Sequence, residues 1–177
     1  DNRTGLADKC PDVKKMTLVN PGKTFADISA HENQPAIEAL AARGIISGKS
    51  EESFQPESTM TRAEFATIIT RGLGLPPKDN AVFDDVTEND WFKTFVNSAY
   101  SYGIIKGVSQ NEFNPNGMIT REEAAGMVTR AAKLCGTNII DDSDYIRTVL
   151  SEFTDYITVA KWAAPGMAFC YSEKILD

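Results

Sequence analysis

The sequence predicts an all-α fold built from helix–loop–helix repeats, and three observations predict it. The segments "TMTRAEFATIITR" and "MITREEAAGMVTR" begin with the same Thr-Arg-x-Glu motif and continue with apolar residues at helical spacing. The matching arginines, Arg62 and Arg121, are 59 residues apart. A Phe-x-Asp segment precedes a further apolar segment three times, at Phe25, Phe83 and Phe153. Such periodic self-similarity indicates duplication of one structural unit.

The composition indicates a folded protein and excludes several classes of partner. The 177 residues are 42% apolar and 9% aromatic, as in globular proteins. The net charge of −7 and a pI near 4.8 argue against nucleic acid and against anionic membrane surfaces. No run approaches the roughly 20 apolar residues of a membrane span, so no membrane insertion is expected. The opening "DNRTGLADKC" does not resemble a signal peptide.

The first repeat contains two expected helices. The first lies in "QPAIEALAARGII", where Ile37, Leu40 and Ala41 recur at helical spacing and Gly44 fits the position just after a helix end. The loop "SGKSEESFQPESTM" follows. The second helix begins at Thr61, and its apolar stripe is expected to be buried.

The second repeat follows the same order, and the third stops early. The second repeat contains "WFKTFVNSAYSYGII", the loop "KGVSQNEFNPNGMI" and the helix that begins at Thr120. The third has the helix "WAAPGMAFCYSEKIL" but no second loop or Thr-Arg helix. "YIRTVLSEF" predicts a short extra helix before it. We expect an N-terminal extension at 1–24, repeats at 25–76 and 83–135, a linker with that helix at 136–152, and a partial repeat at 153–177.

Each Thr-Arg-x-Glu motif has the form of a capping box. The threonine side chain accepts the third helical amide hydrogen, and the glutamate reaches back to the threonine amide. Thr61 and Glu64 form the first expected box, and Thr120 and Glu123 the second. A cap of this kind stabilises a helix by about 0.5–2 kcal/mol.

Capping does not explain the two arginines. A cation in the first helical turn faces the positive end of the helix dipole, which disfavours it. A guanidinium beside unsatisfied N-terminal amides is a suitable site for a carboxylate or phosphate. Two interpretations of Arg62 and Arg121 therefore stay open. One is an external anion, and the other is an internal salt bridge to one of the Phe-x-Asp aspartates, Asp27, Asp85 or Asp155.

The combined motifs resemble the S-layer homology family. The resemblance rests on Phe-x-Asp-[Ile/Val], a first helix that starts with a tryptophan, Gly-Ile-Ile-x-Gly, Phe-x-Pro and Thr-Arg-[Ala/Glu]-Glu. It covers two full repeats and the first half of a third. The resemblance implies an all-α bundle with pseudo-threefold, three-lobed symmetry, here incomplete. It also implies extracellular, non-covalent anchoring of a surface protein to a secondary cell wall polysaccharide, often pyruvylated.

The resemblance also implies roles for residues at matching positions. Arg62 and Arg121 bind the carboxylate, Gly48 and Gly107 let the loop backbone approach the sugar, and Lys49 adds a cation that Val108 replaces in the second repeat. Trp91 and Trp162 stack on a sugar ring or pack between repeats. Asp85 and Asp155 bind sugar hydroxyls or act as caps and bridges. We expect two grooves: Arg62 with Asp85 and Trp91, and Arg121 with Asp155 and Trp162.

Other readings are weaker or remain open. The adjacent acidic pairs at 84–85 and 141–142 do not form a hydrolase site, so we expect no enzyme activity and no cofactor. "DDVTENDWF" lacks the central glycine and terminal glutamate of a calcium loop, and no metal site is expected. Cys10, Cys135 and Cys170 allow one disulfide or buried free thiols. A role in a surface lattice, with another chain or segment completing the third repeat, is the main alternative.

Overall fold

A computed structural model describes residues 15–176. Cys10 and most of the N-terminal extension lie outside this range. The described chain is helical: α2 (Gln34–Ala42), α3 (Arg62–Gly72), α4 (Lys93–Ser101), α5 (Arg121–Leu134), α6 (Ser143–Leu150) and α7 (Ala164–Ser172), with the short 3-10 turns η2 (Ala26–Ile28) and η3 (Tyr156–Thr158). Within it, strand-type pairing is limited to one antiparallel bridge between Thr61 and Met118. The all-α prediction is confirmed, as is the extra helix, α6.

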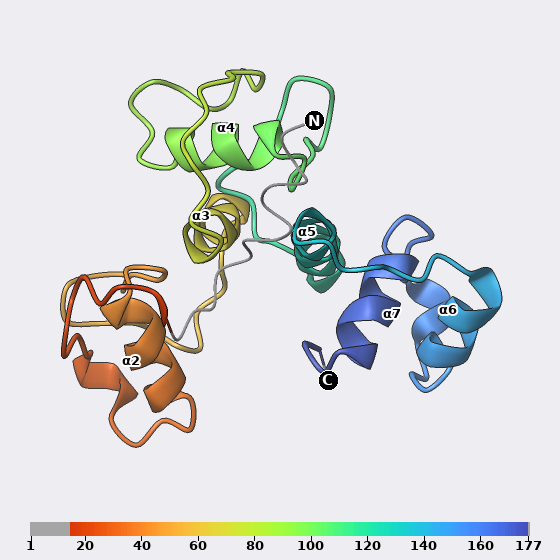
Figure 1. The fold of residues 1–177 in the computed structure, drawn as a ribbon, viewed down its shortest axis with the longest axis horizontal. Helices are drawn as coiled ribbons and strands as arrows, with labels where there is room; N and C mark the ends of the chain where they lie inside the picture. Colours follow the sequence, from red (N-terminus) through yellow and green to blue (C-terminus); the bar gives the residue numbers. More distant parts are fainter. Residues whose placement is uncertain (1–14, 177) are drawn as a thin grey trace.

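Three lobes surround a centre formed by α3 and α5, which Figure 1 shows nearly end-on. One lobe contains α2, the second α4, and the third α6 and α7. Helix α3 packs mainly on α4, and α5 mainly on α7. The second helix of one repeat therefore packs on the first helix of the next repeat.

The Phe-x-Asp phenylalanines anchor the cores of the first two lobes. Phe25 and Phe83 are buried, and each packs at 5.5 Å, centroid to centroid, on the phenylalanine of its own Phe-x-Pro loop, Phe54 or Phe113. Full burial of such a side chain contributes about 1.5–3 kcal/mol. In the third lobe Phe153 packs on Tyr171, with ring centroids 4.6 Å apart.

The helix ends follow the sequence signals. Both capping boxes are formed, at Thr61 and Glu64 and at Thr120 and Glu123. Gly44 and Gly103 follow α2 and α4 with φ of +69° and +73°, the left-handed conformation that favours glycine. The positions of Trp91 and Trp162 differ slightly from expectation. Each tryptophan precedes its helix instead of starting it, because α4 begins at Lys93 and α7 at Ala164.

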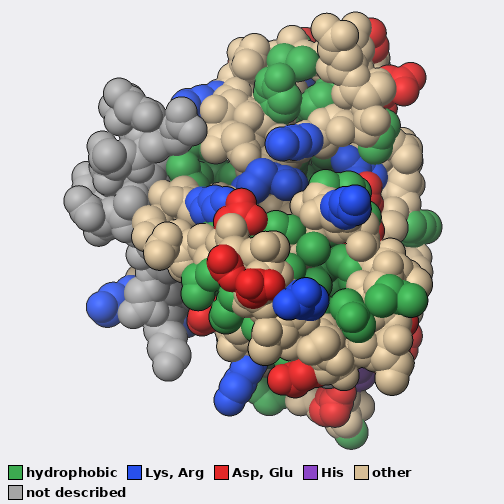
Figure 2. Space-filling model, turned by 90° about the vertical axis from the view of Figure 1, so that its right-hand side faces the viewer, with side chains coloured by type: hydrophobic (Ala, Val, Ile, Leu, Met, Phe, Trp, Pro, Cys, Tyr) green, Lys and Arg blue, Asp and Glu red, His purple; other side chains and the backbone are tan. Residues whose placement is uncertain are grey.

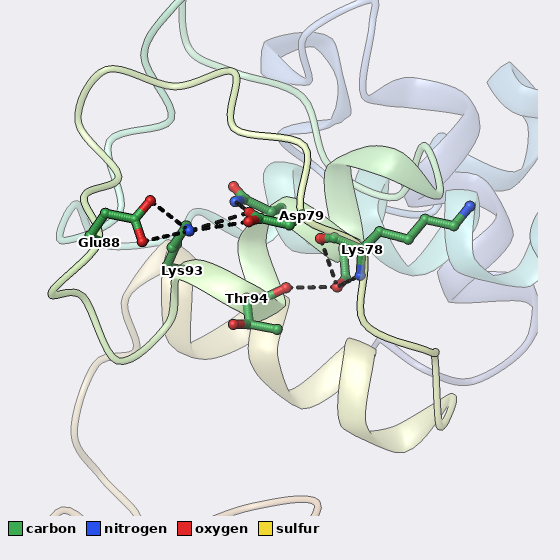
Figure 3. Close-up of polar contacts among 7 residues, drawn as sticks. Lys78, Asp79, Glu88, Lys93 and Thr94 are labelled. Atoms are coloured by element: carbon green, nitrogen blue, oxygen red, sulfur yellow. Dashed lines mark hydrogen bonds and ion pairs between the residues drawn. The ribbon is translucent and has the colours of Figure 1, made fainter.

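A polar network holds the linker between the first two repeats against α4 (Figure 3). The Lys93 ammonium lies between Glu88 at 2.7 Å and Asp79 at 3.3 Å. The buried amide of Asn97 donates to Asp79, and the Ser98 hydroxyl accepts the Lys78 amide hydrogen at 2.9 Å. These contacts fix the path of the chain before the second Phe-x-Asp segment.

Two further features bear on the chain's environment. Cys135 is disulfide-bonded, whereas Cys170 is a buried free thiol whose pKa is raised by burial. Among residues 15–176, no helix is long and apolar enough to cross a membrane.

On the face shown in Figure 2, acidic and basic side chains lie close to one another, with hydrophobic atoms exposed between them.

Candidate functional site: a groove between the first two repeats

A groove of about 400 Å³ lies between the loop of the first repeat, helix α3 and Trp91 of the second repeat. This volume falls in the range of small-molecule sites. The charged residues in its lining are Lys49, Glu64 and Arg71. The rest of the lining consists of Ile45, Ile46, Ser47, Gly48, Phe54, Gln55, Pro56, Ser58, Thr59, Met60, Thr67, Ile68 and Trp91.

Gly48 lines the groove, and a residue with a side chain would not fit at this position. A Cβ on Gly48 would lie 2.5 Å from the Phe25 ring and from the carbonyl oxygens of Ser50 and Ser53. Gly107 is equally crowded, with a Cβ falling 2.6 Å from the Glu112 carbonyl oxygen. Both loops therefore need a glycine for the close approach of their own backbone.

Lys49 and Glu64 form an ion pair across the groove wall, with 2.5 Å between Nζ and Oε1. The second Glu64 oxygen accepts the Thr61 amide hydrogen, so the carboxylate serves both the capping box and Lys49. Burial raises the pKa of Glu64, but the hydrogen bonds from Lys49 and Thr61 outweigh burial and leave the pKa below its usual value. The pair is neutral overall.

The two tryptophans are exposed. Trp91 is 59% exposed at the groove, with one ring edge on Phe92, and Trp162 is 61% exposed. Trp91 therefore offers an apolar ring face beside the groove.

Arg62 lies away from the groove, in contrast to the expected arrangement. The side chain is 4% exposed and points toward the second repeat. The guanidinium donates to the Glu123 carboxylate, to the Phe113 carbonyl at 2.8 Å and to the Lys106 carbonyl at 3.3 Å. Burial lowers the pKa of Arg62, against the opposing charges of Glu123 and Asp85. The internal bridge therefore exists, with Glu123 as its hydrogen-bonded partner.

The expected anion site at the start of α3 is also filled from within. The Arg62 amide donates to the Gly117 carbonyl at 2.9 Å, and the Ala63 amide to the Pro115 carbonyl at 3.0 Å. The Glu64 amide donates to the Thr61 hydroxyl. The loop before α5 thus satisfies the amides that an external carboxylate was expected to meet.

The first two Phe-x-Asp aspartates, Asp27 and Asp85, hold loops and do not line the groove. Asp27 accepts hydrogen bonds from the Phe54 and Gln55 amides, both at 2.8 Å. Asp85 accepts from the Phe113 and Asn114 amides, at 2.9 and 2.7 Å. The expected grouping of Arg62, Asp85 and Trp91 in one groove does not occur.

The second set of predicted residues lies around the start of α5. Arg121 is exposed at the first helical position, and Asp155 is exposed beside η3. Trp162 lies over Gly126, 3.6 Å from where a Cβ would be, and the neighbouring Ala160 amide donates to Glu122 at 2.8 Å. The segment just before α7 therefore lies against α5. Trp91, just before α4, occupies the corresponding place beside α3 in the first groove.

The groove residues that the sequence did not mark as binding residues include Thr67 and Arg71, both on α3. Arg71 belongs to the closing Thr-Arg pair of the duplicated segment, so the repeat alignment marked it. No local rule separates such an arginine from an ordinary surface cation. Thr67 carried no signal, because its counterpart in the second repeat is Gly126.

The described part of the chain contains no cluster of side chains suited to a metal ion. Across residues 15–176, no group of three or more His, Cys, Asp or Glu side chains converges as a metal site would require. His31 lies 3.3 Å from Glu57 on the surface.

The chain is similar to surface-layer proteins and to polysaccharide-degrading enzymes. It is 37% identical over 152 residues to the surface-layer 125 kDa protein of Lysinibacillus sphaericus, covering 86% of this chain and 12% of that protein. It is 41% identical over 111 residues to endo-1,4-beta-xylanase A of Thermoanaerobacterium saccharolyticum, covering 62% and 10%. The surface layer protein of Brevibacillus choshinensis is 37% identical over 124 residues, covering 67% and 11%. The chain thus spans about a tenth of each relative.

A family comparison matches the same repeats that the sequence and fold display. Residues 24–66 and 82–125 match the S-layer homology domain. Each matched segment runs from a Phe-x-Asp segment through the glycine loop into a Thr-Arg helix. The chain belongs to the S-layer homology family.

Proposed function

We propose that this chain anchors a cell-surface protein non-covalently to a secondary polysaccharide of the bacterial cell wall. The observation that carries the proposal is the groove between the first two repeats, which is lined by an exposed tryptophan and by a tight loop that requires glycine. Membership of the S-layer homology family and the surface-layer relatives support an extracellular, wall-associated location.

Three predicted residues have suitable roles in this groove. Trp91 provides an apolar face on which a pyranose ring stacks. Gly48 keeps the loop backbone flush with the groove wall. Lys49, already neutralised by Glu64, offers its remaining donors to sugar hydroxyls. A pyruvyl ketal would add one carboxylate to an otherwise neutral sugar.

A second, smaller contact is proposed near the start of α5. Trp162, Gly107, Arg121 and Asp155 are its candidate residues, and the duplication is the argument for it. Arg62, in this proposal, positions the repeats and does not touch the ligand, because its guanidinium is engaged by Glu123.

A structural lattice role is the alternative, and one observation favours it. Asp27 and Asp85 each hold a Phe-x-Pro loop, whereas the part of the chain that the structure describes contains no such loop on Asp155. We assign residues 153–177 to a partial third repeat that a further segment or another chain completes through Phe153 and Asp155. Repeats one and two are assigned to 25–76 and 83–135, with residues 136–152 as linker.

Relatives that are glycan-degrading enzymes fit a module that serves as an anchor for different partners. Asp27 and Asp85 hold loops, and Glu64 and Glu123 complete capping boxes. We assign the chain binding rather than catalysis.

The test is co-sedimentation with purified cell wall sacculi, before and after hydrofluoric acid removes the secondary polymer. We expect binding to untreated sacculi, little binding after treatment, and at least a tenfold loss in Trp91→Ala. Undiminished binding to stripped sacculi would contradict the proposal. If the lattice role is correct, sedimentation velocity detects self-association that does not depend on added polymer.

A further inference from the structure

The loop before α5 contains the one Asn-Gly pair of the sequence, Asn116 and Gly117. In such a pair the glycine nitrogen reaches the side-chain carbonyl of the asparagine easily, because glycine has no Cβ to obstruct the approach. Asn114, two residues earlier, is followed by proline, whose nitrogen carries no hydrogen and cannot react in this way. The reactive pair therefore lies at one known place in the loop.

The structure places this pair at an exposed β-turn formed by residues 114–117. The Gly117 amide donates to the Asn114 carbonyl oxygen at 3.1 Å, which closes the turn. Asn116 is exposed, and within the described residues its side-chain amide has no hydrogen-bond partner. Exposed turns with few packing contacts open locally at low free-energy cost. The Asn116 side chain is thus open to water and is not held away from the Gly117 nitrogen.

The first repeat forms the same turn without a reactive pair. Residues 55–58 close it with a hydrogen bond from the Ser58 amide to the Gln55 carbonyl oxygen at 3.0 Å. Gln55 has a φ of +59°, and Asn114 has a φ of +56°. The last two residues of the first turn are Glu57 and Ser58. The turn geometry therefore does not require Asn-Gly, and the first repeat supplies a ready control.

The second turn also holds the start of α3, which belongs to the first repeat. The Pro115 carbonyl oxygen accepts the Ala63 amide hydrogen at 3.0 Å, and the Gly117 carbonyl oxygen accepts the Arg62 amide hydrogen at 2.9 Å. Asn116 lies between these two acceptors in the chain. The backbone spacing across Asn116 therefore decides whether both helix-start amides are satisfied, and an amide left without an acceptor there is costly.

We propose that Asn116 is a site of spontaneous deamidation and backbone isomerisation that weakens the junction between the first two repeats with time. The Gly117 nitrogen gives its proton to hydroxide and attacks Cγ of Asn116. The N–Cγ bond forms, the Cγ–Nδ2 bond breaks, and ammonia leaves with a proton from water, which regenerates the hydroxide. Water then opens the cyclic imide, at Cγ to give aspartate or at the main-chain carbonyl to give isoaspartate.

The two products affect the junction differently. Aspartate leaves the backbone unchanged and adds a negative charge at an exposed position. Isoaspartate routes the backbone through Cβ and Cγ, which lengthens the chain between the Pro115 and Gly117 carbonyls by a carbon atom. The turn can then no longer present both carbonyls to α3 in their observed positions. The isoaspartate product therefore weakens the junction, whereas the aspartate product does not.

Peptide mass spectrometry of the purified chain, fresh and after prolonged incubation, tests for the modification. The tryptic peptide 107–121 should gain the mass difference between an amide NH2 and a hydroxyl. The gain should be faster at mildly alkaline than at mildly acidic pH, because the Gly117 amide must lose its proton. Methylation by an isoaspartyl methyltransferase, used as a reagent, measures the isoaspartate fraction. Asn116→Gln should abolish both signals, whereas Asn111→Gln, in the same peptide, should leave both unchanged.

Exchange of the two turns between repeats provides a matched pair of variants. A Cβ on Gly117 would lie 2.3 Å from the Asn114 side chain, so the second turn receives all of the first-repeat residues: Asn114→Gln, Asn116→Glu and Gly117→Ser. This variant should melt like the fresh wild type and should not change on incubation. The reverse variant, Glu57→Asn with Ser58→Gly, should acquire a second deamidation site in the first repeat.

Thermal melts test the proposed effect on the junction. The isoaspartate fraction of incubated wild-type chain should melt about 2–8 °C below the fresh chain, as expected for the loss of one or two backbone hydrogen bonds in a domain of this size. Asn116→Asp, measured fresh, should melt like the wild type because its backbone is unchanged. Incubated Asn116→Gln should also keep the melting temperature of the fresh chain.

Either of two results would overturn the inference. If the free peptide 107–121 deamidates while the folded chain does not, the turn protects Asn116. If isoaspartate accumulates at Asn116 without a loss of melting temperature, the junction does not depend on this backbone spacing. These measurements use no polysaccharide, so their failure would leave the anchoring function in place, and a failure of the anchoring function would leave this inference in place.

Discussion

Arg62 and Glu123 belong to the two Thr-Arg helices and are joined by a hydrogen-bonded ion pair. Glu123 also accepts the Thr120 amide hydrogen within its own capping box. One carboxylate therefore caps α5 and receives the arginine of α3. The pair links the first repeat to the second through a buried arginine side chain.

Removing this arginine should destabilise the whole bundle. Arg62→Met is expected to cost about 3 kcal/mol, because it leaves the Phe113 carbonyl and the Glu123 carboxylate without their donor. A double-mutant cycle with Glu123→Gln should give a coupling energy of about 1–3 kcal/mol. Urea unfolding measures both. Additive effects of the two substitutions would show that the pair contributes nothing to stability.

Gly48→Ala should damage the groove loop. The new methyl would meet the Phe25 ring and two backbone oxygens, and such overpacking costs about 1–3 kcal/mol. Gly72→Ala is the control, since its Cβ would meet only Ile45 at 3.7 Å near the end of α3. Thermal melts should show a lower melting temperature for Gly48→Ala and an equal or higher one for Gly72→Ala. An unchanged melting temperature for Gly48→Ala would show that the loop shifts to accommodate the added methyl group.

Ser98→Ala should release the linker from α4. The substitution removes the acceptor of the Lys78 amide hydrogen at a buried position, at a cost of about 1–2 kcal/mol. Limited proteolysis should then cleave residues 76–81 faster than in the wild type. Thr94→Ala, on the exposed side of the same helix, is the control and should leave the cleavage rate unchanged.

Acid should weaken the first repeat through Asp27. Hydrogen bonds from the Phe54 amide and the Ser53 hydroxyl lower the pKa of Asp27 from 3.8 to about 2. Because the folded-state pKa is depressed, the stability that the carboxylate provides is present above pH 4 and lost as pH falls toward 2.

We therefore expect Asp27→Asn to lower the melting temperature at pH 7 and to flatten its fall between pH 4 and pH 2. The exposed Glu51→Gln is the control. Calorimetry across this pH window measures the difference, and parallel curves for Asp27→Asn and the wild type would contradict the assigned role.

The elements were predictable from sequence, because capping boxes, glycine stops and helical periodicity are local signals. The burial of the Arg62 side chain and its hydrogen-bond partners were not predictable from sequence. Its unfavourable position at a helix start was correctly identified, but the groups that satisfy it lie 44 to 61 residues later in the chain. The carbonyls of Pro115 and Gly117 likewise reach the amides of α3 only through tertiary packing.

The groove was predicted in part. Gly48, Lys49 and Trp91 line it, as the family resemblance implied, whereas Arg62 and Asp85 lie elsewhere. The position of Arg71 depends on Phe95 in the following repeat, which no pattern within α3 encodes. Residues whose role depends on a neighbouring repeat were the ones that sequence reasoning misplaced.

Because α3 packs on α4 and α5 packs on α7, the segment copied during duplication differs from the segment that folds together. A gene fragment cut cleanly at a repeat border would give a polypeptide whose last helix has lost its packing surface. Shuffling or grafting these modules should succeed better when the cuts fall inside the glycine loops, so that each transferred piece keeps a Thr-Arg helix with the helix that follows it.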